Sequence, residues 1–220
     1  MKILLEGKPS FTITHIDLEP GETVTAESGA MASMDAALDM KAVLNGGFFS
    51  AFVKKFFGGE SFIVNIFTNN TNEVQRVTFT QTTPGDMMVK ELHGESYCLQ
   101  RGAYICSTPG IKLGVRWAGL ASFIAKEGLF KLVVSGNGSV VYGSYGAMVE
   151  KIVEGEYIVD SSHLVAYEPT MKLKIQLSGG LISSMTSGEG FVTRVVGNGK
   201  IVMQSRSMTG LAAWVNRFLH

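Results

Sequence analysis

A short pattern that begins with Gly-Glu occurs three times along the chain and constrains the fold more than any other feature. Each copy continues with strand-forming residues, reaches a small or turn-tolerant residue eight positions after the glycine, and then becomes apolar. Repetition at this scale indicates that one β unit has been copied and that the copies bury a common apolar interior. The copies run from Gly21-Glu22 to Gly29-Ala30-Met31, from Gly94-Glu95 to Gly102-Ala103-Tyr104, and from Gly155-Glu156 to His163-Leu164-Val165.

A second motif alternates with the first. A phenylalanine is followed six residues later by a triplet that contains asparagine. Such triplets between β-forming runs favour tight hairpins, because φ > 0 costs little there. We therefore predict three related hairpins, of which the last, near Phe191, pairs with the Gly-Glu segment near Gly21 and closes the arrangement. The triplets are Thr68-Asn69-Asn70 after Phe62, Gly136-Asn137-Gly138 after Phe130, and Gly197-Asn198-Gly199 after Phe191.

Much of the chain alternates apolar and polar residues with period two, which is typical of half-buried strands. Glycine is frequent, with 26 residues, and proline is rare, with five. Gly-rich turns at close spacing favour an all-β sandwich or barrel over βαβ units. We predict a single all-β domain of three pseudo-repeats, approximately 1–88, 89–147 and 148–206. The clearest strands are 11–14, 77–80, 111–117 and 172–177.

Two segments have helical spacing instead. Residues 47–57 lie between glycines and carry Phe48, Phe49, Phe52, Phe56 and Phe57 on one side. The C-terminal segment 207–220, with its helix near 208–219, repeats Leu211, Trp214, Val215 and Phe218 at the same spacing. These residues are our candidates for contact with a partner or a membrane surface. Because Lys54, Lys55 and Arg217 supply little basic charge, packing on a sheet or at a subunit interface is the favoured interpretation.

Composition excludes some classes of function. The chain has 19 basic and 19 acidic residues and 45% apolar residues. A net charge of zero provides no global field for polyanions, so nucleic acid is an unlikely partner. The N-terminus lacks a secretory apolar region, and no run is long enough to span a bilayer, so we expect a cytoplasmic protein. Cys98 and Cys106 are interpreted as buried small hydrophobes.

No residue pattern in the sequence predicts a catalytic or metal centre. Asp160 and His163, with Glu156 nearby, are the nearest approach to a polar site, since a triad needs an imidazole between a nucleophile and a carboxylate. The other copies carry glycine where His163 stands, which favours a structural role. The four histidines are scattered, and no metal-ligand spacing occurs. Glu22, Glu95 and Glu156 are predicted to be solvated, with a shared cation site as the alternative. We expect neither a cofactor nor a catalytic activity.

Several segments in order resemble the altered-inheritance-of-mitochondria, or mitochondrial biogenesis, family, over roughly residues 10–206. The resemblance implies a double-stranded β-helix or jelly-roll-like sandwich similar to the tryptophan RNA-binding attenuation protein, assembled as a trimer or a higher ring, with no established enzymatic activity. The segments that carry it are 18–31, 59–62, 159–166 and 187–191.

These features favour a non-enzymatic homo-oligomeric β scaffold, a trimer or a multiple of three, that contacts a protein partner or a membrane periphery. One alternative is a small-molecule binder or hydrolase with a pocket around Asp160 and His163. A second alternative is an RNA-binding ring, although repeated Lys or Arg beside aromatic residues is lacking.

Overall fold

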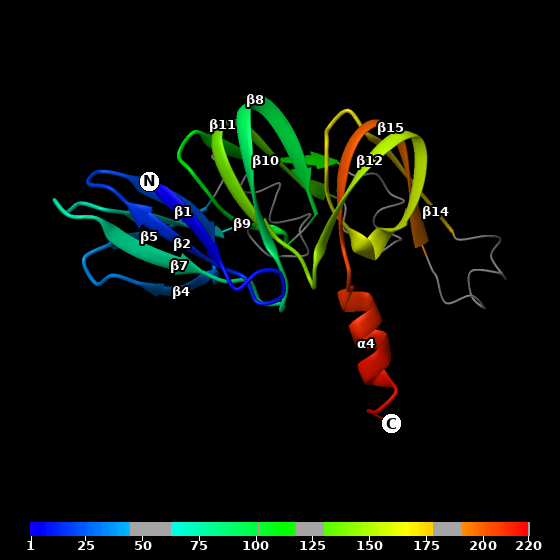
Figure 1. Cartoon of the computed structure of the whole chain (residues 1–220), viewed down its shortest axis with the longest axis horizontal. Helices are drawn as coiled ribbons and strands as arrows, with labels where there is room; N and C mark the ends of the chain where they lie inside the picture. Colours follow the sequence, from blue (N-terminus) through cyan, green and yellow to red (C-terminus); the bar gives the residue numbers. More distant parts are fainter. Residues whose placement is uncertain (45–62, 101, 118–129, 178–190, 220) are drawn as a thin grey trace.

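The computed structural model describes residues 1–44, 63–100, 102–117, 130–177 and 191–219. These residues form two antiparallel sheets and a C-terminal helix, as Figure 1 shows. The smaller sheet has the strand order β1-β2-β7-β4. The larger runs β12-β15-β13-β8-β11-β9-β3-β6-β5, with β10 beside β11 and β14 beside β15. The predicted all-β fold is confirmed.

The strands fall into three consecutive units, named here the first, second and third unit. The first contains β1 (Lys2–Glu6), β2 (Ile13–Leu18), β3 (Thr23–Glu27), β4 (Met31–Met34), β5 (Asp39–Leu44), β6 (Ile63–Thr68) and β7 (Gln75–Phe79). The second contains β8 (Met87–Leu99), β9 (Tyr104–Ser107), β10 (Ile111–Trp117) and β11 (Phe130–Gly143). The third contains β12 (Met148–Asp160), the 3-10 turn η1 (Ser161–His163), β13 (Leu164–Tyr167), β14 (Lys172–Leu177) and β15 (Phe191–Gln204).

The same set of strand pairings occurs in each unit. The segment with Gly-Glu pairs with the segment that carries the asparagine triplet: β2 and β3 with β7 and β6, β8 with β11, and β12 with β15. A four-residue strand then pairs with the latter segment, as β4 with β7, β9 with β11 and β13 with β15. A longer strand pairs with the other half of the segment that carries the asparagine triplet, as β5 with β6, β10 with β11 and β14 with β15.

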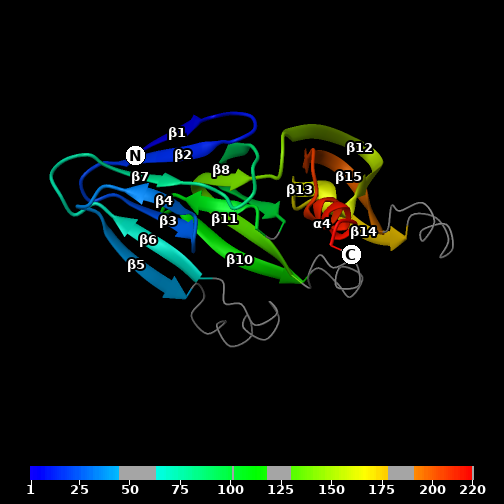
Figure 2. The same cartoon turned by 90° about the horizontal axis from the view of Figure 1, so that it is seen from below.

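Neighbouring units are joined by one equivalent strand pair. Thr25 and Ala26 of β3 pair with β9, and Cys98 and Leu99 of β8 pair with β13. Figure 2 shows the first unit at one end of the long axis and the third at the other, with the second between them. The predicted closure of the last asparagine segment on Gly21 is wrong, because Gly197 in β15 pairs with Gly155 of its own unit. Among the described strands, β12 pairs with β15 alone and β4 with β7 alone.

The glycine-asparagine triplets of the second and third units are bends inside long strands, so the prediction of hairpins there is wrong. Gly136 and Gly138 have φ of +119° and +143° within β11, where the register shifts between Ser135 and Asn137. A Cβ on Gly136 would lie 2.2 Å from the Gly110 carbonyl oxygen. The positive φ that suits a hairpin also serves a β-bulge, which turns a strand without reversing it. Only Asn69-Asn70 lies between two strands, β6 and β7.

Three apolar clusters make up the interior, and each takes residues from a neighbouring unit. The first unit's cluster, centred on Phe67 and Phe79, includes Cys106 of β9. The second includes Ala166 of β13, and the third includes Cys98 of β8. Strand pairs and shared clusters therefore join the units into one body.

The predicted C-terminal helix is present as α4 (Met208–Asn216) and follows β15 after a short connection. It extends away from the strands in Figure 1. The predicted helix at 47–57, with its five phenylalanines, lies outside the described residues.

Candidate functional site

Helix α4 begins at a serine cap and leaves its apolar side chains in solvent. The Gly210 amide donates to Ser207 Oγ at 3.0 Å, which satisfies one free donor of the first turn. None of the nine helical residues is buried. Trp214 is 58% exposed and Phe218 is 69% exposed, and their rings meet edge to face at 5.0 Å. We call Met208–Leu219 the α4 surface.

Four predicted interaction residues, Leu211, Trp214, Val215 and Phe218, lie on the α4 surface and are exposed. The helix contains no charged residue, and Arg206 and Arg217 flank it. It has nine residues, and no helix in the described part of the chain is long and apolar enough to cross a membrane. Within the described part of the chain, the α4 surface is therefore an exposed apolar patch.

Asp160 and His163 are close in sequence but serve different partners. Asp160 caps η1, and its Oδ1 accepts from the Ser162 amide at 2.8 Å and from Ser162 Oγ at 2.7 Å. His163 Nδ1 lies 2.7 Å from the Gln204 carbonyl oxygen, to which it donates in the matching tautomer. Glu156 pairs with Arg194 at 2.5 Å on the exposed surface. The geometry assigns structural contacts to all three residues.

The Gly-Glu glutamates are engaged separately. Glu22 pairs with the Met1 amino group at 2.6 Å. Burial acts to raise the pKa of Glu22, but hydrogen bonds from the amino terminus and the Glu19 amide bring it below its usual value. Glu95 accepts from the His93 amide at 2.7 Å, which lowers its pKa. Among the described residues, no group of three His, Cys, Asp or Glu side chains is placed to hold a metal ion.

Both cysteines are buried, as the sequence indicates. Burial raises the pKa of the Cys106 thiol, so the reactive thiolate is disfavoured. Their positions in the shared clusters of neighbouring units give them a packing role.

A hollow of about 640 Å³ opens where the three units converge, and the sequence did not reveal it. Its walls come from the turns that precede β4, β9 and β13 and from the chain that follows β7, β11 and β15. Met208 and Thr209, at the start of α4, also line it. The repeat contains a sequence signal for the hollow, because the residue six positions after the glycine of each Gly-Glu pair lines it. These residues are Glu27, Gln100 and Ser161.

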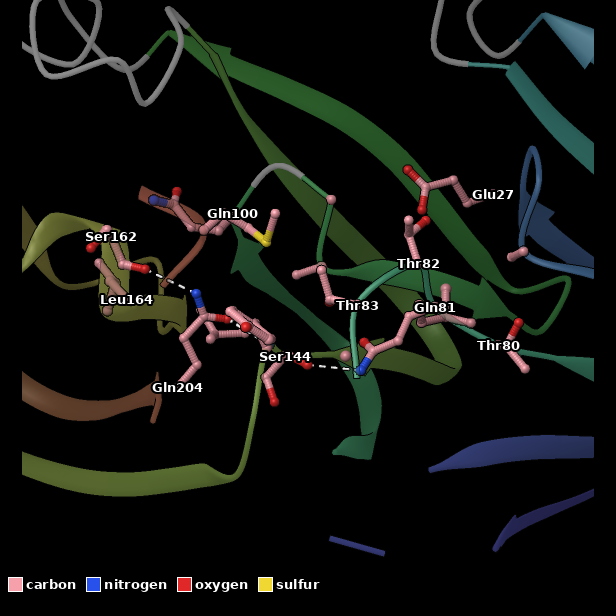
Figure 3. A pocket seen from close by; sticks show the side chains of 18 of the residues that line it. Glu27, Thr80, Gln81, Thr82, Thr83, Gln100, Ser144, Ser162, Leu164 and Gln204 are labelled. Atoms are coloured by element: carbon pink, nitrogen blue, oxygen red, sulfur yellow. Dashed lines mark hydrogen bonds between the residues drawn. The ribbon is translucent and has the colours of Figure 1, made fainter. Parts of the chain in front are cut away.

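Three glutamine side chains occupy this hollow, as Figure 3 shows. Gln81 Nε2 donates to the Ser144 carbonyl oxygen at 2.7 Å, which links the first unit to the second. Gln204 Nε2 donates to the Ser162 carbonyl oxygen at 2.9 Å, and Gln204 Oε1 accepts from the Tyr145 amide at 2.8 Å. Gln100 Oε1 is buried and has no hydrogen-bond partner among the described residues. We call this site the glutamine hollow.

The fold and these contacts define an all-β protein of three joined sheet units that carries an exposed apolar helix. Comparison with known families places it more narrowly: the family described as Mitochondrial biogenesis AIM24 matches residues 3–206. The chain belongs to this family, as the sequence resemblance predicted.

Two proteins of Streptococcus pyogenes are similar to this chain. An uncharacterized protein is 26% identical over 229 residues, covering 100% of this chain and 91% of the relative. The crystal structure of protein SPYM3_0169 has a TM-score of 0.80 and 24% sequence identity, and covers 99% of each chain. The structural likeness supports the fold, and neither name states an activity.

Proposed function

We propose that this protein is a non-enzymatic scaffold that assembles with further copies of itself and uses the α4 surface to dock on a protein partner or on the periphery of a membrane. The observation that carries the proposal is the α4 surface, in which no helical residue is buried although the side chains are mainly apolar. Apolar side chains stabilise a structure only when water is removed from them.

The length of α4 supports this interpretation. Isolated helices shorter than about 12–15 residues are marginal in water, and most helical stability in proteins comes from packing of an apolar face. Helix α4 has nine residues and gains no such packing from the described part of its own chain. Contact with another molecule would supply the missing packing and hold the helix.

The charge around α4 is compatible with either type of docking surface. The stretch 205–220 contains no acidic residue and has Arg206 and Arg217 at the two ends of the helix. Trp214 and Phe218 are residue types that are enriched both at protein interfaces and at membrane–water boundaries. Two arginines add a modest attraction to an anionic surface.

Unpaired strand edges at the two ends of the molecule support assembly. Within the chain, β3 offers an edge to β9, and β8 offers the equivalent edge to β13. The equivalent half of β12 has no such partner among the described strands, and β4, the counterpart of β9 and β13, has one open side. Open edges are templates for pairing with another chain. The β12 edge of one copy therefore complements the β4 edge of the next.

Such a contact joins two different surfaces and is head-to-tail, so repeated use of it closes a ring when the rotation between copies allows it. The ring proposed here is a trimer or a multiple of three. Exposed Ile158, on the same half of β12 and 50% accessible, is an apolar residue that such a contact helps to cover.

Light scattering after size-exclusion chromatography, combined with flotation on vesicles, tests the proposal. We expect a mass of three chains or a multiple, and capture either by vesicles containing anionic lipid or by an apolar protein partner. Replacing Trp214 and Phe218 together by glutamate should abolish docking. The matched control is Phe11→Glu, because Phe11 is 74% exposed in the connection between β1 and β2, outside the α4 surface. A monomer that binds equally with and without the two aromatic residues would contradict the proposal.

The two alternative functions receive less support. For a hydrolase, Asp160 and His163 would need to act together, and their hydrogen bonds lead elsewhere. For an RNA-binding ring, a chain of zero net charge gains little from phosphate attraction. Oligonucleotide retention at low salt, lost at high salt, would support the RNA alternative.

A further inference from the structure

We propose that the glutamine hollow binds an uncharged, hydroxyl-rich small molecule of about the size of a mono- or disaccharide. The glutamine hollow adjoins the α4 surface at Met208 and Thr209, but its lining is mainly polar, and the inference does not depend on the docking proposal. Its volume of about 640 Å³ falls within the range of small-molecule sites, roughly 300–1,000 Å³.

The position of the glutamine hollow allows a ligand to touch all three units at once. Its walls are corresponding turns of the three units, so each unit supplies polar groups from the same place in its fold. A concave site built this way does not need a dedicated loop, because the joining of the units creates it.

Two of the three amides are already fixed in place. Gln81 and Gln204 each donate to a backbone carbonyl oxygen, and Gln204 also accepts from a backbone amide. Side chains held in one rotamer lose little conformational freedom when a ligand binds, which lowers the cost of recognition. The hollow is therefore preorganised rather than formed on binding.

Gln100 provides a hydrogen-bond acceptor that a ligand can satisfy. Its Oε1 is buried without a hydrogen-bond partner in the described part of the chain. An unsatisfied buried acceptor loses its hydration without compensation. Gln100 as a whole is half-buried, so a rotation of its side chain brings Oε1 into the hollow, where a ligand hydroxyl that donates to it recovers the missing hydrogen bond. In Figure 3 the side chain lies beside the labelled Ser162 and Leu164.

The chemistry of the described walls selects for an uncharged ligand. Besides the amides, the polar groups are mainly the hydroxyls of threonine and serine, such as Thr80, Thr83 and Ser162. Glu27 is the acid of the described lining, and it already has an interaction of its own. Amides and hydroxyls both donate and accept, which matches the alternating donor and acceptor character of a sugar hydroxyl.

Ligand-observed saturation-transfer NMR on the full chain tests this site, with D-glucose and maltose as neutral probes and glucose 6-phosphate as the charged one. We expect saturation transfer to the neutral sugars and at least tenfold weaker binding of them to Gln100→Met, which keeps the side-chain shape and removes the acceptor. Since Gln100→Met also removes an unsatisfied buried group, the thermal midpoint of the free variant should stay equal or rise. Gln75→Met, at a half-buried strand position outside the hollow, is the matched control.

A second variant, Gln100→Asn, keeps the amide and shortens its reach, and it should weaken sugar binding without loss of folding. Three results would overturn the proposal: no saturation transfer to either neutral sugar, equal transfer in wild type and Gln100→Met, or preference for the phosphorylated sugar. Because the readout is binding in the hollow, loss of docking by α4 leaves it unaffected.

Discussion

At the scale of single residues, glycine with positive φ determines where the long strands bend. Gly94 in β8 and Gly155 in β12 have φ of +102° and +86°, and Gly21 occupies the equivalent turn between β2 and β3 with +79°. Side chains with a Cβ rarely adopt this backbone conformation. The bend lets each half of a long strand pair with a different neighbour, which the repeated pairing pattern requires.

Gly155→Ala tests this conformational role. A Cβ at Gly155 would meet nothing within 4 Å, so the cost is that of the backbone conformation, about 1–2 kcal/mol. Gly114→Ala is the control, because Gly114 in β10 has no positive φ and its Cβ would make an ordinary contact 3.7 Å from the Val133 carbonyl oxygen. We expect a lower urea midpoint for the first variant and an equal or higher midpoint for the second. Equal midpoints for both would show that Gly155 carries no strain.

At the scale of elements, α4 depends on its own capping because no packing from the described chain supports it. Ser207 is the cap, and loss of such a side chain costs roughly 1 kcal/mol of helix stability. For a nine-residue helix this is enough to unfold it locally.

We therefore expect Ser207→Ala to lower the helical circular dichroism signal and to speed amide exchange in residues 208–216, while the unfolding midpoint of the β body stays unchanged. Thr209→Ala is the control: it places the best helix former inside the same helix and should increase the helical signal. A fall in the midpoint of the whole protein would mean that α4 packs on the strands.

The smaller sheet carries a charge pair that gives stability a pH dependence. Arg76 of β7 donates to both carboxylate oxygens of Asp17 in β2, at 2.6 and 3.0 Å. This hydrogen bonding to Arg76 is the main reason that the pKa of Asp17 lies below its usual value. A lowered pKa means that the folded state favours the carboxylate. The stabilisation is therefore complete above about pH 4 and is lost as the pH falls through the folded-state pKa.

Arg76→Gln removes that contribution. The variant should have a lower urea midpoint than wild type at pH 7, and the difference should shrink as the pH falls below about 4. Lys200→Gln, which breaks the exposed pair with Glu150, is the control and should change the midpoint little at either pH. A difference for Arg76→Gln that does not vary with pH would contradict an electrostatic origin.

At the scale of the whole molecule, local pattern was enough to find elements but not their assembly. Period-two alternation predicted β10 and β14, because apolar and polar residues alternate along both segments and so fall on opposite faces of a strand. The triplet Gly136-Asn137-Gly138 was misread, since a hairpin and a β-bulge both need φ > 0 and differ only in what the distant chain does. The glutamine hollow was missed for the same reason, because Gln81, Gln100 and Gln204 meet only when three units converge.

The proposed assembly makes a residue-level prediction about the contact between copies. In β9 and β13, the residue just after the bulge pairs across the unit boundary: Cys106 with Ala26, and Ala166 with Leu99. On β4, the residue just after the bulge is Ser33. On the partner side of the contact, Ala26 and Leu99 each lie five positions after the glycine of their Gly-Glu pair. The corresponding residue of β12 is Asp160. Ser33 of one copy should therefore face Asp160 of the next.

Replacing Ser33 and Asp160 together by cysteine should produce a disulfide between copies, because directly opposed strand residues have Cβ atoms about 4.5–5.5 Å apart, near the span of a disulfide. On non-reducing gels a head-to-tail ring gives dimers and then a limiting trimer or multiple of three. Ser33→Cys with Glu154→Cys is the control, since Glu154 lies on the other half of β12, before the bend. A cross-linked monomer, which runs faster on the gel, would mean that the two edges meet within one chain. A monomer without a cross-link would mean that the two edges do not meet. Either result rules out the ring, because a ring needs each β12 to reach a different copy.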